Sequence, residues 1–186
     1  MHDLKRTTAL GAATPVQEQV GDVLIAENAD VALASVSARL GREADTARLL
    51  KSGFGITAPN AGAFSVAGDY TVFWTGPDQW MISTSLQGHE LIADELIAVL
   101  GNAASVTEQS GAWVQFDVSG GARTAMLERL TALPVRRMKP NEAGRTRIEQ
   151  LGCFVLCAES HFVILGPRAS AQSLYHSLIT AARSIA

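Results

Sequence analysis

The sequence predicts an α+β protein made of two pseudo-repeated halves, each with the order β-α-β-β-β-α and with antiparallel sheets packed with helices. Segments with apolar residues at every second position alternate with segments at helical spacing. This alternation occurs twice, about 82 positions apart, and each half ends in a predicted hairpin followed by a helix. We assign an N-terminal arm to residues 1–22 and one domain to residues 23–186, with halves at about 23–102 and 103–186.

The first half carries the clearest hairpin of the sequence. Predicted strands at residues 70–74 and 79–84 are joined through Gly76-Pro77-Asp78. Proline at the second position of a turn, followed by aspartate, is typical of a tight turn. A strand and a helix precede this hairpin, and a helix with Ile92, Leu96 and Val99 on one face follows it.

The second half repeats this order of elements. A strand at residues 113–118 is followed by a helix, a strand, a hairpin around residues 158–160 and a last helix. At an offset of 82, apolar residues coincide in four places: Trp80 with Phe162, Ile82 with Ile164, Trp74 with Leu156, and Leu96 with Leu178. We therefore expect the two halves to be related by a pseudo-twofold.

Composition and charge exclude several classes of protein. The chain has 186 residues, 47% of them hydrophobic, and a formal net charge of −3, so it can form a core and is not intrinsically disordered. Its lack of a basic stripe argues against nucleic acid as a partner. Its N-terminus lacks the apolar run of a signal peptide, and no stretch is long enough to span a membrane. We therefore expect a cytoplasmic protein with no membrane partner.

Motifs with a known catalytic mechanism are missing from the sequence. It contains no P-loop, no dinucleotide-binding glycine pattern and no nucleophile elbow. The four histidines are scattered without metal-ligand spacing, and Cys153 and Cys157 lie in one predicted strand, too far apart to bridge. We assign no catalytic, cofactor-binding or metal-binding residue to this chain.

Two groups of residues are candidates for contact with a partner protein. Trp74 and Trp80 flank the predicted turn, where paired tryptophans serve either as core or as anchors for a partner or a flat ring. The basic run near Arg136 is either a solvated loop or a contact for an acidic surface. The predicted partner-contact residues are Trp74, Pro77, Asp78, Trp80, Arg136 and Arg137.

Several short segments carry a resemblance to a known family. The stretch Phe73-Trp74-Thr75-Gly76-Pro77-Asp78-Gln79-Trp80-Met81-Ile82 is similar to a recurring hairpin of the gamma subunit family of heterotetrameric sarcosine oxidase. The segments Val118-Ser119-Gly120-Gly121-Ala122-Arg123 and Gly166-Pro167-Arg168-Ala169-Ser170 fit the same pattern, and the resemblance covers roughly residues 30 to 183. That family is a relative of the folate-binding aminomethyltransferase and YgfZ-like folds, so the resemblance implies a folate-binding-domain-like fold.

The resemblance also implies a function and a set of partners. It implies a non-catalytic gamma subunit, assembled with alpha, beta and delta subunits, in a complex that converts sarcosine to glycine. Such a complex transfers one carbon to tetrahydrofolate and forms hydrogen peroxide. This chain would bind no cofactor, and the other subunits would carry FAD, FMN, NAD, zinc and tetrahydrofolate.

A second hypothesis is a free-standing folate-binding protein related to aminomethyltransferase and YgfZ. Its pocket would lie between the two halves, with Trp74 or Trp80 stacked on a pterin ring. One departure bears on it: relatives often carry Pro-Leu-Asp-Leu where this chain has Leu133-Pro134-Val135-Arg136-Arg137, so an acidic residue is missing there. An interaction module of an unrelated complex, or an enzyme with an unrecognised site, are the remaining alternatives.

Overall fold

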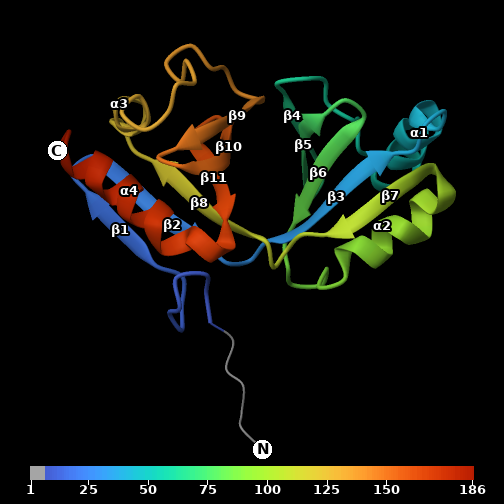
Figure 1. Cartoon of the computed structure of the whole chain (residues 1–186), viewed down its shortest axis with the longest axis horizontal. Coiled ribbons are helices and arrows are strands. Elements are labelled where there is room, and N and C mark those ends of the chain that lie inside the picture. The colour runs from blue at the N-terminus through green and yellow to red at the C-terminus, as the bar shows by residue number, and fades with distance from the viewer. Residues whose placement is uncertain (1–6) are drawn as a thin grey trace, which may run out of the picture. The chain divides into compact units, whose positions relative to one another are not determined.

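The computed structural model describes residues 7–186 and has the predicted α+β architecture. Its described residues form two antiparallel sheets and four α-helices, and they divide into two compact units (Figure 1). Of the described residues, unit 1 contains 7–29, 112–140 and 144–186, and unit 2 contains 30–111 and 141–143. The short strand β9 (Glu142–Ile148) therefore starts in unit 2 and continues in unit 1.

Unit 2 is a five-stranded sheet with two helices on one face. The strands follow the spatial order β4-β5-β6-β3-β7, and α1 and α2 lie on the same side of the sheet (Figure 1). Leu50 of α1 and Leu96 of α2 are fully buried against the sheet. The elements are β3 (Ala32–Ala38), α1 (Glu43–Phe54), β4 (Phe64–Ala67), β5 (Tyr70–Gly76), β6 (Gln79–Thr84), α2 (Ile92–Leu100) and β7 (Ala104–Glu108).

Helix α1 shows why this part of the sequence forms a helix and where it ends. Glu43 and Asp45 lie in its first turn and Lys51 in its last, which suits the helix dipole at both ends. The helix ends at Gly55, whose φ of 69° is left-handed and whose N–H bonds to the Lys51 carbonyl oxygen at 3.1 Å. The Ile56 N–H bonds to the Leu50 carbonyl oxygen at 3.2 Å, which completes the reversal.

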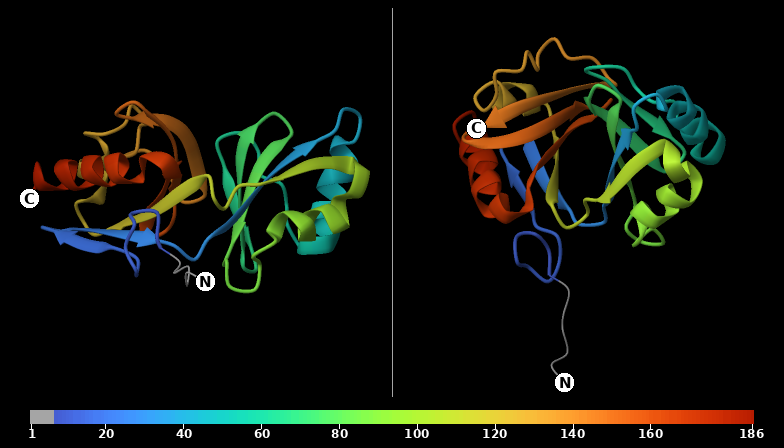
Figure 2. Two further views of the ribbon diagram at one scale, coloured as in Figure 1. Left: turned by 60° about the horizontal axis from the view of Figure 1, so that its bottom comes forward. Right: turned by 45° about the vertical axis from the view of Figure 1, so that its right-hand side comes forward.

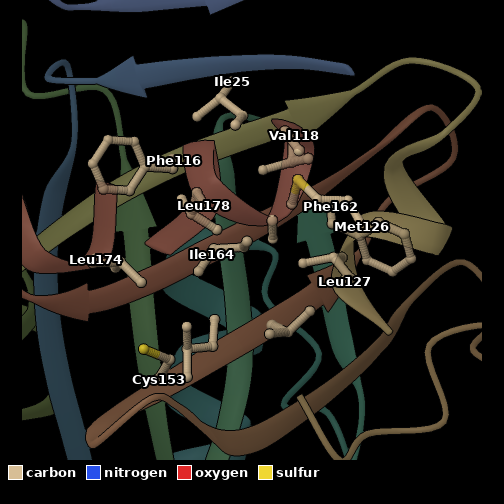
Figure 3. Packing of buried hydrophobic residues seen from close by; sticks show 14 of the residues in the cluster. Ile25, Phe116, Val118, Met126, Leu127, Cys153, Phe162, Ile164, Leu174 and Leu178 are labelled. Atoms are coloured by element: carbon tan, nitrogen blue, oxygen red, sulfur yellow. The ribbon is translucent and has the colours of Figure 1, made fainter. Parts of the chain in front are cut away.

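Unit 1 is a six-stranded sheet in the order β1-β2-β8-β11-β10-β9. The long C-terminal helix α4 lies along one face of the sheet (Figure 2). Figure 3 shows Leu174 and Leu178 of α4 packed with Phe116, Ile164 and other strand residues in one apolar core. The elements are β1 (Gln17–Val20), β2 (Val23–Asn28), β8 (Trp113–Ser119), α3 (Arg123–Leu127), β9, β10 (Leu151–Cys157), β11 (His161–Pro167) and α4 (Ala171–Arg183).

The described part of the predicted N-terminal arm is structured. Residues 17–20 form strand β1, which pairs antiparallel with β2 as the edge of the sheet. The buried carboxylate of Glu27 accepts hydrogen bonds from the N–H groups of Leu10 and Val16, each at 3.1 Å. The hydrogen-bond partners of this segment lie in β2 and α4, which local composition does not reveal.

The repeat is present, and each half gives its first strand to the sheet of the other. After β2 and β7, which begin the two halves, the elements read β3-α1-β4-β5-β6-α2 and β8-α3-β9-β10-β11-α4, which is the predicted order. However, β2, at the start of the first half, pairs with β8, and β7, at the start of the second, pairs with β3. The compact units therefore do not coincide with the sequence halves 23–102 and 103–186.

Three of the four pairs of residues predicted to be equivalent at the offset of 82 occupy equivalent positions in the structure. Val36 lies opposite Trp80, and Val118 lies opposite Phe162 in the same way. Ile82 and Ile164 are both fully buried, as are Leu96 and Leu178. The fourth pair is wrong by one residue.

The error concerns Trp74, which corresponds to Cys157 rather than to Leu156. Trp74 lies opposite Trp80, whereas Cys157 lies opposite Phe162. The physical reason is the irregularity between Trp74 and Gly76, which shifts the register of β5 against β6. A bulge of this kind is set by the hairpin turn and not by the apolar pattern.

Candidate partner-contact site

The tip of the β5–β6 hairpin presents two of the predicted contact residues to solvent. Pro77 and Asp78 are both exposed. Asp78 has a φ of 53°, and its carbonyl oxygen accepts a hydrogen bond from the Ala38 N–H at 2.9 Å. The tip is therefore fixed to the end of β3, and a fixed loop loses little conformational entropy when it binds a partner.

The two tryptophans of this hairpin have different environments. They are cross-strand neighbours, as expected, because Trp74 lies opposite Trp80. Trp80 is only 7% exposed, and its indole N–H donates to the Pro59 carbonyl oxygen at 3.0 Å. Trp74 is half-buried against the same core. The structure thus gives Trp80 a packing role inside unit 2, and the exposed part of the hairpin is the turn itself.

The second predicted group, Arg136 and Arg137, lies in unit 1 in the loop after α3. Arg136 binds the Glu128 carboxylate through Nε at 2.8 Å and Nη2 at 2.6 Å. This pairing lowers the pKa of Glu128 and raises that of Arg136. The Arg136 side chain is still 71% exposed. Neighbouring Val135 is buried and anchors the loop, so the guanidinium is held in one orientation at the surface.

The structure therefore divides the six predicted residues between the two units. Trp74, Pro77, Asp78 and Trp80 share one hairpin of unit 2, and Arg136 and Arg137 are adjacent in a loop of unit 1. Each group offers a separate surface of its own unit.

A groove along α4 in unit 1 was not predicted from the sequence. Two adjoining hollows, of about 520 Å³ and 440 Å³, share His176, Ser177 and Glu149. Hydroxyl and amide side chains of α4 form one wall, and the β9–β10 turn forms the other. The sequence signal was the polar face of α4, but the opposite wall comes from residues far away in the chain. The lining residues include Gln172, Ser173, Thr180, Ser184, Arg129 and Gln150.

The two cysteine thiols of unit 1 are buried. Cys153 and Cys157 both lie buried in β10, and burial raises the pKa of Cys153 to about 11. Among residues 7–186 there is no group of three or more side chains that could hold a metal ion. No helix in that range is both long and apolar enough to cross a membrane.

Solved structures show which known proteins share this fold. A chain of the heterotetrameric sarcosine oxidase from Corynebacterium sp. U-96, in complex with pyrrole 2-carboxylate, matches with a TM-score of 0.77 and 23% identity. The match covers 90% of this chain and 88% of that chain, so the two are of similar length. The glycine cleavage system aminomethyltransferase T from Bartonella henselae matches with a TM-score of 0.65 and 14% identity.

The second match covers 84% of this chain but 48% of the aminomethyltransferase, so the present chain spans about half of that protein. The sequence matches no protein-family model and no curated protein. The resemblance inferred from the sequence is thus confirmed at the level of the fold, which this chain shares with a small chain of sarcosine oxidase and with aminomethyltransferase T.

Proposed function

We propose that this chain is a small, non-catalytic subunit of a heterotetrameric sarcosine oxidase, corresponding to its gamma subunit. The observation that supports this most is the likeness over nearly the full length of both chains to one chain of such an oxidase, with a TM-score of 0.77. The aminomethyltransferase, by contrast, has about twice the length of this chain. A small protein with the fold of one part of a larger enzyme is well suited to complete an assembly rather than to act alone.

The function of the subunit is structural in this proposal. It assembles with the alpha, beta and delta subunits, which carry FAD, FMN, NAD and zinc and bind tetrahydrofolate. The complex oxidises sarcosine to glycine, transfers the one-carbon unit to tetrahydrofolate and reduces oxygen to hydrogen peroxide. The Pro77-Asp78 turn and the Arg136-Arg137 loop are the contacts that this chain contributes, because both are exposed and both are held in place by its own structure.

Affinity isolation from the native host tests the proposal. The tagged chain is isolated under gentle conditions, and its native mass and visible spectrum are recorded. We expect a yellow hetero-oligomer that consumes sarcosine and oxygen. After the subunits are separated, the flavin should remain with the other chains.

The opposite result is a colourless monomer of 19.7 kDa. Such a monomer would overturn the subunit proposal and would turn attention to the free-standing folate-binding protein. Titration with tetrahydrofolate, followed by tryptophan fluorescence, would then be the next measurement, because Trp74 and Trp113 are both only half-buried.

A further inference from the structure

Helix α2 is apolar on nearly all sides, although only part of its surface is covered. Of its residues Ile92–Leu100, only Asp94 and Glu95 are polar. Helices that are apolar all round are typical of positions buried on all sides. Within the described structure α2 packs against β3, β7 and α1, which bury Ile92, Leu96 and Leu100. The opposite side of the helix is exposed.

The uncovered residues form one stripe along the helix. Leu91, which precedes the first turn, is 65% exposed, and Ile97 is 47% exposed. Asp94 and Ala98 are exposed as well. Spacings of three and four residues place these four side chains next to one another on a helix. We call Leu91, Asp94, Ile97 and Ala98 the α2 stripe.

Single exposed aliphatic residues are common on protein surfaces. The distribution of such residues over the molecule is therefore more informative than the exposure of any one of them. Four large hydrophobic residues are exposed among the described residues, and all four lie in unit 2. Two of them are Leu91 and Ile97, on one helix. The other two, Leu40 and Val66, are not part of the helix and lie in a turn and on an edge strand.

The charged side chains at the start of α2 are all negative. From residue 52 to residue 122 the sequence contains seven aspartates and glutamates and no lysine or arginine. Glu90, Asp94 and Glu95 are part of this series and lie at the start of α2. A partner with the same charge would be repelled, whereas lysine or arginine side chains around an apolar centre would complement this edge.

We propose that the α2 stripe is a docking surface for a larger subunit that presents aliphatic side chains bordered by lysine or arginine. This inference rests on the proposed function, because it names the face of the chain that enters the complex. The apolar residues supply the buried centre of the contact, and the carboxylates of Glu90 and Asp94 supply its rim.

Recombination of the purified subunits tests this inference. The wild-type chain is separated from the flavin-containing subunits that co-purify with it, labelled, and titrated back into them while fluorescence anisotropy is recorded. The test variant is Leu91→Gln/Ile97→Gln, and the matched control is Leu40→Gln/Val66→Gln, which changes two exposed aliphatic residues of the same unit outside the stripe. Melting of the isolated chains shows whether the variants fold as the wild type does.

We expect the stripe variant to raise the dissociation constant at least about tenfold, as truncation at the centre of an interface does, and the control to change it less than about twofold. Asp94→Asn should weaken association more at low than at high salt, because added ions screen the interaction with cationic groups. Glu43→Gln, in the first turn of α1, is its control.

Equal binding of the stripe variant and the wild type would overturn the inference and leave the proposed function intact. A loss of affinity for Asp94→Asn that does not change with salt would overturn the cationic rim. If the wild-type chain recombines with no flavoprotein, the proposed function fails, and the inference that depends on it fails too. If the wild-type chain self-associates and the stripe variant is a monomer, a second copy of this chain occupies the stripe, and the inference of a larger subunit is wrong.

Discussion

The hydroxyl of Tyr175 donates a hydrogen bond to the Glu18 carboxylate across 2.7 Å, although the two residues are 157 positions apart. Arg183 binds the other carboxylate oxygen of Glu18 at 3.0 Å. These contacts join α4 to the edge strand β1. The bond from Tyr175 lowers the pKa of Glu18, and burial together with the bond to Glu18 raises the pKa of Tyr175 to about 12.

Tyr175→Phe should destabilise unit 1 by about 1 kcal/mol, because it removes this hydrogen bond and keeps the ring. The ring itself stacks on Phe116, with centroids 5.8 Å apart, and phenylalanine preserves that contact. Urea unfolding measures the change. Tyr70→Phe in unit 2 is the control, because the ring of Tyr70 contacts Phe54 and His89 and phenylalanine keeps those contacts. Equal effects of both variants would contradict a special role for Tyr175.

The same contact predicts a dependence of stability on pH. The pKa of Glu18 in the folded state lies below its ordinary value of 4.5, so its contribution is present above that pH and is lost as the pH falls further. The pKa of Tyr175 is raised from 10.0 to about 12, so its contribution is present below pH 10 and is lost as the pH rises toward 12. The stability difference between wild type and Tyr175→Phe should therefore shrink at both extremes. A difference that is constant with pH would contradict this assignment.

Because of the repeat, we expect equivalent core residues to contribute similar amounts to the free energy of unfolding. Leu96 and Leu178 are both fully buried, one in the core of each unit. Each replacement by alanine should lower the free energy of unfolding by about 2–5 kcal/mol, because it leaves a cavity. Chemical denaturation of the two variants gives the values. Leu40→Ala, at a side chain that is 98% exposed, should change stability by less than about 0.5 kcal/mol.

The chain just before β2 passes so close to residue 120 that this position requires glycine. Gly120 follows β8 with a φ of 99°, and a Cβ atom there would collide with the backbone of Asp22, just before β2. Gly120→Ala should cost more than about 1 kcal/mol, because steric overlap adds to the strain of a positive φ. Gly11→Ala also has a positive φ but has open space around it, and so measures the strain alone. Thermal unfolding that gave the same loss for both would contradict the collision.

Arg136 and Arg137 should matter for assembly and not for folding. The ion pair between Arg136 and Glu128 is exposed, and such pairs contribute little to stability. Arg136→Ala/Arg137→Ala should therefore melt like the wild type but bind the flavin-containing subunits more weakly. Arg48→Ala, which breaks an exposed pair with Asp45 in unit 2, is the control. Unchanged affinity of the double variant would remove this loop from the proposed interface.

Both cysteines should resist thiol reagents in the native protein. Cys153 and Cys157 are buried, and the raised pKa of Cys153 keeps its thiol protonated near neutral pH. Ellman's reagent should react slowly with the folded chain and should titrate two thiols after denaturation. Fast reaction of either thiol in the native protein would show that β10 opens readily.

Local sequence predicted the elements well because their signals are local. The alternation at residues 113–118 became β8, and the Gly76-Pro77-Asp78 turn became the β5–β6 hairpin. The last helix was found from its apolar stripe, which contains Leu174 and Leu178. The bulge after Trp74 was missed because the apolar pattern does not record it. The contacts of residues 8–20 were not predicted because their partners lie elsewhere in the chain.

The structure shows which of the predicted contact residues are exposed and which are enclosed. The exposure of Pro77, Asp78, Arg136 and Arg137 agrees with a contact role, whereas Trp80 is enclosed by the core of its unit. The α2 stripe was not singled out, because the periodicity of Ile92, Leu96 and Val99 identifies the buried side of the helix only. Exposure of Ile97 is known only once the neighbours of α2 are placed.

Periodicity, turn residues and short motifs are properties of neighbouring positions, so the order of the strands and helices, the repeat and the resemblance in fold could be read from the sequence. The exchange of β2 and β7 between the sheets, the binding of residues 10 and 16 by Glu27, and the exposure of particular aliphatic residues follow from the folded structure. These features depend on contacts between residues that are distant in the chain. Such contacts form where hydrogen-bonding edges and apolar faces meet in space, and no local pattern records where that is.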